Sequence, residues 1–244
     1  MLSKNQIKFI NSLHQKKFRD QHKLFIAEGF KTISEVLNSN IQLHELYVTE
    51  SLNSDAKQVL ISENELKKIS ALKTPNKALG IFKIPVAKSI DTSKLIVALD
   101  TVRDPGNLGT IIRLCDWFGV RDLVCSKSTV DCYNPKVIQA TMGSFARVNI
   151  SYIDLEVFLK EQTVVKYGTF MKGDNLYEAN LSNNGILVMG NEANGISKNI
   201  EELTDYKLAI PRFGKKQETE SLNVATATAI LLSEFRRNSI EKSS

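Results

Sequence analysis

Polar side chains that could take part in chemistry follow three predicted strands in the later part of the chain. Asn107 and Arg113 come after the apolar segment KLIVALD. Glu192 comes after GILVMG, and Ser221 and Asn223 come after KLAIP. Ligands of α/β sheets bind at the carboxyl ends of parallel strands, where strand-to-helix turns also offer free backbone amides. The sequence therefore predicts one binding site built from three turns.

The turn near the C-terminus organises this prediction. Ser221 stands before a long apolar-rich helix and is a good N-cap for it. Asn223 fits that interpretation less well, because a second polar amide in the first turn is not needed for capping. A ligand-binding role for both residues is the alternative that we carry forward.

The other residues each have a simple structural alternative. Asn107 could cap the helix that follows it, and Glu192 could be a solvated turn residue in a glycine-flanked loop. Arg113 could form a surface ion pair with Asp116. None of the three turns matches the dinucleotide motif GxGxxG or the phosphate loop GxxxxGK[ST], which argues against both of those nucleotide sites.

Strands and helices alternate in two regions of the chain. From residue 94 onward, short buried strands alternate with helices, which predicts an α/β fold with a largely parallel sheet. Residues 1–88 also alternate strands and helices and predict a small separate α/β domain. Within it we expect a helical stretch around residues 53–58, and a helix after residue 29 whose apolar face is Phe30, Ile33, Val36 and Leu37. Residues 87–94 are polar and form the expected linker.

Composition sets limits on function. The chain has 244 residues, 42% of them hydrophobic, and no run of about 18 apolar residues that would cross a membrane. Its polar, basic N-terminus is not a secretory signal, so we expect a cytoplasmic protein. Cys115, Cys125 and Cys132 lack CxxC spacing and are expected to be reduced thiols, neither zinc ligands nor a disulfide framework.

Charge and histidine content differ between the two predicted domains. The net charge is +5, and residues 1–88 hold 14 lysines and arginines against 8 acidic residues. A one-sided basic excess suits a nucleic-acid backbone. All three histidines lie before residue 45, so acid–base chemistry in the later domain must proceed without imidazole.

Together, the three turns resemble the three motifs of the SpoU-type (TrmH-like) RNA 2′-O-ribose methyltransferases of the SPOUT superfamily. The order and the spacing of the turns are those of the family. Small departures are Ala193, Asn194 and Thr226, none of which removes a motif residue. FIAEGFKTISEVL and ALGIF resemble the substrate-binding domain of the same family. The matching motif positions are Asn107, Gly109 and Arg113; Gly190, Asn191, Glu192 and Gly195; and Pro211, Ser221, Leu222 and Asn223.

The resemblance implies a fold and partners. Residues 1–88 would be an RNA-binding α/β domain similar to a kink-turn-binding ribosomal protein, and residues 89–244 a methyltransferase domain with a deep trefoil knot. Periodicity alone gives no hint of a knot. The implied cofactor is S-adenosylmethionine, the implied substrate is RNA, and the implied assembly is a homodimer that needs no metal and no membrane.

The resemblance also implies residue roles. The catalytic set is Arg113, Asn107, Glu192, Ser221 and Asn223. The cofactor-binding set is Gly190, Asn191, Glu192, Ile210, Ser221, Leu222 and Asn223. The family proposal makes Arg113 a base, but a guanidinium stays protonated, so we interpret Arg113 as a clamp on phosphate and on the ribose hydroxyl. Asn107 and Asn223 would orient the ribose with support from Ser221, and Glu192 would fix Arg113 or a loop amide.

Three alternatives stay open. The chain could methylate transfer RNA, although its added N-terminal domain resembles the ribosomal-RNA members. It could be a non-catalytic RNA-binding or ribosome-assembly protein, which the retention of all five polar residues disfavours. It could be a Rossmann-like enzyme with a small-molecule substrate, which the missing glycine motif and the basic N-terminal domain disfavour.

Overall fold

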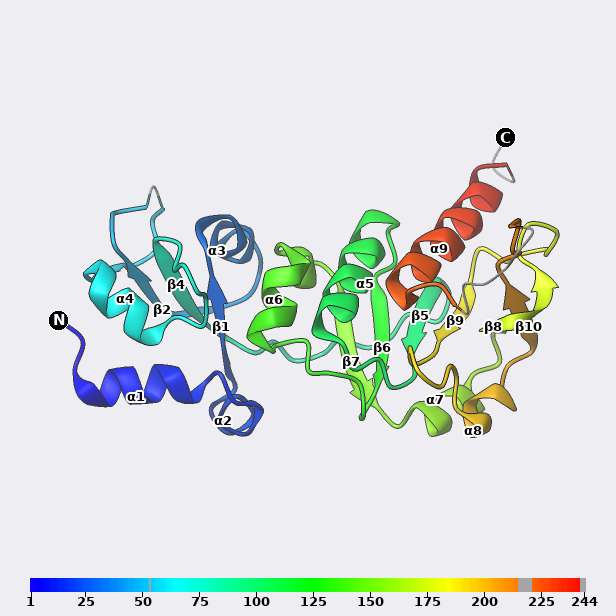
Figure 1. The fold of residues 1–244 in the computed structure, drawn as a ribbon, viewed down its shortest axis with the longest axis horizontal. Coiled ribbons are helices and arrows are strands. Elements are labelled where there is room, and N and C mark those ends of the chain that lie inside the picture. The colour runs from blue at the N-terminus through cyan, green and yellow to red at the C-terminus, as the bar shows by residue number, and fades with distance from the viewer. Residues whose placement is uncertain (53, 215–220, 242–244) are drawn as a thin grey trace. The chain divides into compact units, whose positions relative to one another are not determined.

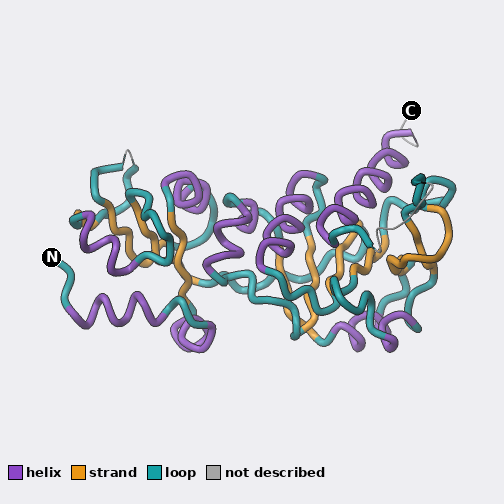
Figure 2. Tube along the Cα trace, viewed as in Figure 1, coloured by secondary structure: helices purple, strands orange, loops and turns teal. Residues whose placement is uncertain are grey.

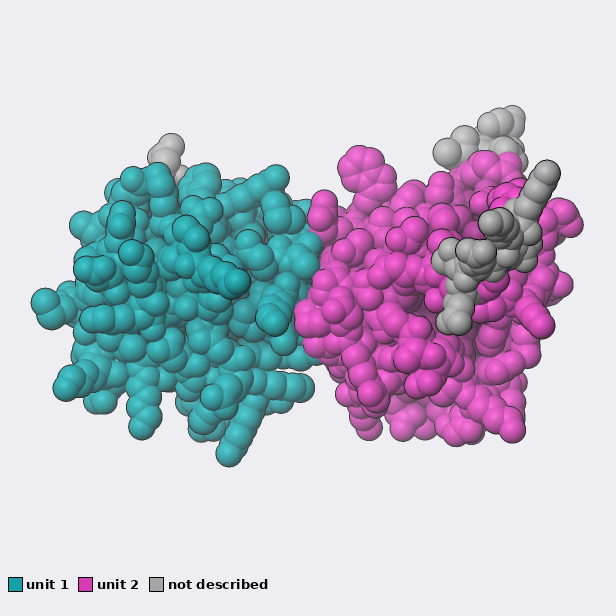
Figure 3. Space-filling model, in the orientation of Figure 1, with its two compact units in different colours: residues 1–86, 131–147 teal, residues 87–130, 148–244 magenta. Residues whose placement is uncertain are grey.

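The computed structural model describes residues 1–52, 54–214 and 221–241 of the chain. The chain forms two compact units, coloured separately in Figure 3. One comprises Met1–Val86 and Asp131–Arg147, and the other comprises Ala87–Val130 and Val148–Ser244. None of the described helices is long and apolar enough to span a lipid bilayer.

The first unit is built around a four-stranded mixed sheet in the order β1-β4-β2-β3. Its apolar core gathers residues from these strands and from the helices beside them, including Ile10, Leu13, Ile26 and Ile81. The elements from residues 1–86 are α1 (Lys4–Ser12), α2 (Lys16–His22), β1 (Leu24–Glu28), α3 (Phe30–Leu37), β2 (Leu43–Val48), β3 (Val59–Leu60), α4 (Glu63–Ile69) and β4 (Ala78–Lys83).

Two details of this unit differ from the sequence predictions. Ile33 and Val36 of α3 are buried as expected, but Phe30, the first residue of the helix, is 51% exposed. The expected helix around residues 53–58 is wrong. Residues 54–58 form bends and coil, in which Gln58 bonds the backbone of Leu52 and Ser54.

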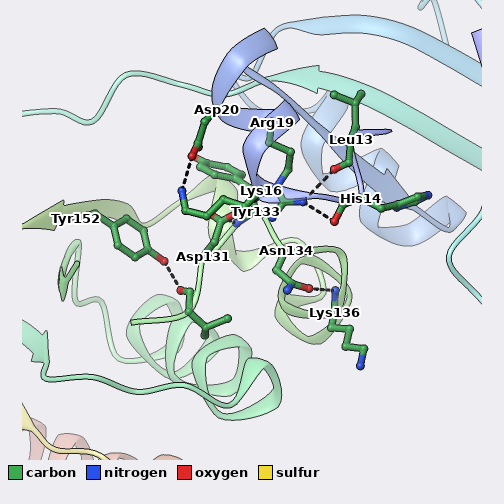
Figure 4. A network of polar contacts seen from close by, with 11 residues as sticks. Leu13, His14, Lys16, Arg19, Asp20, Asp131, Tyr133, Asn134, Lys136 and Tyr152 are labelled. Carbon is green, nitrogen blue, oxygen red and sulfur yellow. Dashed lines mark hydrogen bonds and ion pairs between the residues drawn. The ribbon is translucent and has the colours of Figure 1, made fainter. Parts of the chain in front are cut away.

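A segment distant in sequence completes the first unit. Residues Asp131–Arg147 carry α6 (Pro135–Thr141) and the 3-10 turn η1 (Ser144–Ala146). Asn134 caps α6 and Pro135 opens it. The ring of Phe25 in β1 contacts Tyr133 and Phe145 at centroid distances of 4.9 and 5.6 Å. The buried Arg19 guanidinium bonds Asp131 Oδ2 at 2.6 Å and the carbonyls of Leu13 and His14 (Figure 4).

The second unit is a six-stranded parallel sheet in the order β10-β8-β9-β5-β6-β7 (Figures 1 and 2). The predicted α/β class with a mostly parallel sheet is therefore confirmed. The elements are β5 (Leu95–Leu99), α5 (Pro105–Trp117), β6 (Asp122–Ser126), β7 (Asn149–Ile153), α7 (Leu155–Glu161), β8 (Lys166–Asn175), β9 (Gly185–Met189), α8 (Lys198–Glu201), β10 (Tyr206–Ala209) and α9 (Val224–Glu241).

Helices cover both faces of this sheet. α7 and α8 pack together on one face, over Ile96, Val124 and Ile186. α5 and α9 lie side by side on the other face (Figure 1). Arg236 of α9 donates from Nε to the carbonyl of Phe118 at 2.6 Å and so satisfies the C-terminus of α5, while burial lowers the pKa of its guanidinium.

The pairing of β8 with β10 has an interruption. Lys207 pairs with Gly168, but the next residue, Leu208, pairs with Asp174. The residues between Gly168 and Asp174 therefore bulge out of the ladder. Gly173 allows this close passage, because a Cβ there would lie 2.2 Å from the carbonyl oxygen of Lys207.

Candidate active site

The three predicted turns meet in the second unit. Asn107 Nδ2 donates a hydrogen bond to Glu192 Oε1 at 2.7 Å, and Asn223 Nδ2 donates to Asn107 Oδ1 at 2.8 Å. These residues come from the first turn of α5, the loop after β9 and the start of α9. Side chains separated by 85 and 116 positions in the sequence thus form one chain of polar contacts.

Asn107 lies inside α5 and does not cap it. The helix begins at Pro105, earlier than predicted, and Asp104 is its N-cap, accepting from Asn107 N at 2.8 Å. The predicted capping alternative for Asn107 is therefore wrong. Because a carboxylate already caps the helix, the Asn107 amide group is available for Glu192 and Asn223.

Asn223, and not Ser221, caps α9. Its Oδ1 accepts from the backbone N–H groups of Ala225 at 2.9 Å and Thr226 at 3.2 Å. The predicted cap at Ser221 is wrong because two further residues, Leu222 and Asn223, precede the helix. Asn223 therefore has two tasks: its oxygen begins the helix and its amide holds Asn107.

Arg113 is exposed on α5. Within the described part of the chain its guanidinium makes no ion pair, so the predicted pair with Asp116 is not formed. Glu192 contacts Asn107 and not Arg113. The nearby Cys115 is buried, and burial raises the pKa of its thiol to about 12, so it is no nucleophile.

A cavity of about 940 Å³ adjoins the chain of polar contacts. Six of the seven predicted cofactor residues line it, and Asn223 is the exception. The six are Gly190, Asn191, Glu192, Ile210, Ser221 and Leu222. Residues 215–220, which belong to the third motif loop, lie outside the described residues.

The cavity also has walls that the sequence analysis missed. The β8 bulge contributes Thr169, Phe170, Met171 and Lys172, and α9 contributes Val224, Ala227 and Leu231. The glycines at 168 and 173 on either side of the bulge were the available signal. The α9 residues recur every three to four positions and so lie on one face of the helix.

The loop after β9 is tightly folded. A Cβ on Gly190 would lie 2.2 Å from Gly195 C and from Ile196 N, so only glycine fits there. Asn191 and Gly195 exchange backbone hydrogen bonds of 2.9 and 2.8 Å, and Gly195 has φ of +68°. Asn191 Oδ1 accepts from Ala193 N at 2.8 Å. The side chain of Asn191 therefore organises the loop, while its position lines the cavity.

This cavity fits a nucleoside-containing cofactor. Its size lies at the upper end of the range typical for small-molecule sites, about 300–1,000 Å³. Apolar side chains of Met189, Leu208, Ile210 and Leu222 offer surface for a flat base, and Gly190 also lines the cavity. The fold and the site define an α/β enzyme with a cofactor pocket at the carboxyl edge of a parallel sheet.

Comparison with known proteins identifies the family. Residues 94–233 match the model of the SpoU rRNA methylase family, and residues 4–80 match that of the MRM3-like substrate binding domain. The chain belongs to the SpoU rRNA methylase family, as the motifs predicted.

Individual relatives agree with this assignment. The chain is 32% identical to the 23S rRNA (guanosine(2553)-2′-O)-methyltransferase RlmP of Bacillus subtilis, over 96% of this chain and 97% of that one. A solved structure from Porphyromonas gingivalis, assigned to the TrmH family of RNA methyltransferases, is 39% identical with a TM-score of 0.88, over 97% of this chain and 99% of that one.

The cofactor prediction is tested by a third comparison. An AdoMet-bound rRNA methyltransferase from Sinorhizobium meliloti has a TM-score of 0.85 and is 29% identical, over 97% of this chain and 96% of that one. The predictions of a methyltransferase and of S-adenosylmethionine as its cofactor are confirmed.

Proposed function

We propose that the protein methylates the ribose 2′-hydroxyl of a nucleotide in large-subunit ribosomal RNA. The observation that carries this proposal is the contact chain Glu192–Asn107–Asn223 beside the cavity. Full-length similarity to a Bacillus enzyme named for 23S rRNA supports the choice of RNA. The guanosine in that enzyme's name is the first nucleotide to examine.

Methyl transfer needs an aligned hydroxyl and a route for its proton. The bound cofactor supplies a methyl group on a positively charged sulfur, which is a good leaving group. Asn107 and Asn223 present polar groups from two helix starts and orient the ribose, and Ser221 lines the cavity. Glu192 holds Asn107 by its 2.7 Å contact, and this replaces the predicted contact to Arg113.

Arg113 acts as a clamp in this proposal. Its exposed guanidinium can bond a phosphate and the ribose oxygen together and lower the pKa of the hydroxyl. The proton leaves to phosphate or water, because the guanidinium itself stays protonated.

Further predictions belong to the same proposal. The first unit binds RNA, as its basic excess and its match to a substrate-binding domain suggest. The methyltransferase domain, predicted over residues 89–244, forms a trefoil knot near the third motif. The protein forms a homodimer, for which Trp117, 84% exposed at the end of α5, offers an apolar contact. It acts in the cytoplasm without a metal.

The test is ribose-methylation mapping of total RNA from a strain that lacks the gene. We expect the loss of one 2′-O-methyl group in large-subunit RNA, restored by the wild-type gene and not by an Arg113→Ala gene. Loss of a transfer-RNA methyl group instead would contradict the proposed substrate. An unchanged methylation map would contradict the enzymatic function.

A further inference from the structure

A buried carboxylate lies directly after β5, outside the set of residues that line the cavity. Asp100 is 5% exposed. Its Oδ2 accepts from Ser197 N at 2.7 Å, and its Oδ1 accepts from Thr101 Oγ1 at 3.0 Å. The backbone turns sharply here, since Thr101 has φ of +63°.

Two hydrogen bonds attach the loop after β9 to residues 100 and 101. Asp100 holds its last residue, Ser197, through the backbone amide. Asn191, near its beginning, donates from Nδ2 to the carbonyl oxygen of Thr101 at 2.7 Å. The Gly190–Ser197 loop is therefore attached at both ends to residues 100 and 101.

Glu192 lies between these two attachments. Its side chain is exposed, and within the described residues its one side-chain hydrogen bond is the 2.7 Å contact with Asn107. Because the Glu192 side chain is exposed, its position follows from the position of the loop. A shift of about 1 Å in such a group can lower a rate on the order of a hundredfold.

We propose that Asp100 is a positioning residue for methyl transfer. Its carboxylate fixes the Gly190–Ser197 loop, the loop places Glu192, and Glu192 orients Asn107 toward the ribose. A carboxylate suits this task because its bond to an amide is charge-assisted and stronger than a neutral bond. The inference deepens the proposed function and rests on it.

The alternative is that Asp100 only stabilises the fold, and Asp122 supplies a matched control. Asp122 is also 5% exposed, and it also accepts one backbone and one side-chain donor, Asp91 N at 3.3 Å and Asn149 Nδ2 at 2.6 Å. It opens β6, whereas Asp100 follows β5. Because the two strands are parallel, Asp122 lies at the N-terminal ends of the strands, whereas the site lies at their C-terminal ends.

The experiment measures single-turnover methyl transfer at saturating cofactor and RNA, below the melting temperature of every variant. We expect Asp100→Ala to lower the rate about tenfold to a hundredfold, and Asp122→Ala to leave it within about twofold while losing similar stability. Asp100→Asn should restore most of the rate, because an amide oxygen can still accept from Ser197 N. A normal rate in a folded Asp100→Ala protein would overturn the proposal.

A double-mutant cycle then tests the route. If Asp100 acts through Glu192, Asp100→Ala should slow a Glu192→Ala enzyme little further. A double variant whose loss of rate equals the product of the two single losses would contradict this route. If Asp100→Ala does not fold, Asp100→Ser, whose shorter side chain carries no carboxylate, takes its place in the cycle under the same criterion.

Hydrogen exchange supplies a readout that needs no activity. Exchange across residues 190–197 should rise in the Asp100 variant and not in Asp122→Ala. Unchanged exchange would overturn the anchoring step. A wild-type protein without RNA methylation would instead contradict the proposed function, and the exchange comparison would still decide the anchoring by Asp100.

Discussion

At the residue scale, Arg113 is the side chain whose role is most open to test. Arg113→Ala should lower methyl transfer roughly a hundredfold to several thousandfold, a loss of about 3–5 kcal/mol of transition-state stabilisation. Cofactor affinity should stay near normal, since Arg113 does not line the cavity. Arg113→Lys should fail similarly, because an ammonium cannot contact two oxygens with a planar fork. The measurement is single-turnover transfer together with cofactor calorimetry.

A matched control is Arg121→Ala, an exposed arginine just before β6 at the opposite edge of the sheet. It should keep both rate and affinity. Near-normal turnover in a folded Arg113→Ala protein would remove Arg113 from the active site.

The two tasks of Asn223 can be separated by one substitution. Asn223→Asp keeps an oxygen that accepts from Ala225 N and Thr226 N, so the cap of α9 and the melting temperature should be retained. It removes the donor to Asn107, so the rate should fall about tenfold or more. Thermal melting and turnover are measured on the same samples. Asn223→Asp with full activity would show that the contact with Asn107 is dispensable.

The five polar residues were predicted as one set because together they resemble the three family motifs, and the structure joins Asn107, Glu192 and Asn223 by hydrogen bonds. Which oxygen caps which helix could not be predicted. Asp104, Asn107, Ser221 and Asn223 are all capable caps, and the choice depends on where the backbone first becomes helical. The contact of Glu192 with Asn107 spans 85 positions, and no local pattern encodes it.

At the element scale, we expect the N-terminal cap of α4 to make a pH-dependent contribution to stability. Glu65 accepts from the backbone N–H groups of Ser62 and Leu2, and these bonds lower the pKa of its carboxyl from 4.5 to about 2. Since the folded-state pKa is the lower one, this contribution is present above pH 4.5 and is lost as the pH falls toward 2. Glu65→Gln should therefore lower stability at neutral pH but much less near pH 2.

Urea unfolding at several pH values measures this difference. Glu63→Gln is the control, because Glu63 lies in the same first turn and within the described residues its carboxylate accepts no hydrogen bond. A Glu65→Gln deficit that does not shrink on acidification would contradict the capping account.

Segment Asp131–Arg147 belongs to a different unit from the residues that flank it in the sequence. It lies between strands of the second unit in the chain but packs in the first, through contacts such as Arg19–Asp131 that span 112 positions. Asp131→Ala should cost about 3–5 kcal/mol, because it leaves the buried Arg19 charge without its partner. Chemical denaturation measures the loss.

The control is Glu35→Ala in the same unit. It breaks the ion pair between Glu35 and Arg147, whose side chains are 41% and 47% exposed respectively. Its loss should cost under about 1 kcal/mol. Equal losses in the two variants would show that the Arg19–Asp131 pair has no special weight.

At the scale of the whole molecule, the alternation of strands and helices was sufficient to predict α/β architecture and a parallel sheet. Strand order was not predictable, because β8 and β10 lie on the far side of β9 from β5 and no local signal specifies that placement. The knot also depends on the path of the whole chain, so it stays a prediction from the family resemblance.

The division into two units decides how the predicted RNA binding by the first unit should be tested. Deleting residues 1–88 would remove β1 and α3, against which α6 and η1 pack, so lysine substitutions are the cleaner perturbation. Lys31 lies in the first turn of α3, and Lys73 lies in the loop that Glu28 holds by accepting from Ala71 N at 2.9 Å. Glu28 and Gly29 lead directly into α3, so both charges belong to one end of the unit.

Lys31→Gln combined with Lys73→Gln should weaken RNA binding and lower the slope of log affinity against log salt by about 1–2, since each phosphate contact contributes roughly 0.7–0.9. Cofactor affinity should not change. Fluorescence titrations of ribosomal RNA fragments from low to physiological salt give both quantities. The control pair, Lys94→Gln with Lys160→Gln, removes the same charge from the second unit and should alter affinity little. If both pairs change the slope equally, the basic excess of residues 1–88 acts only as diffuse charge, and these two lysines are not part of the RNA interface.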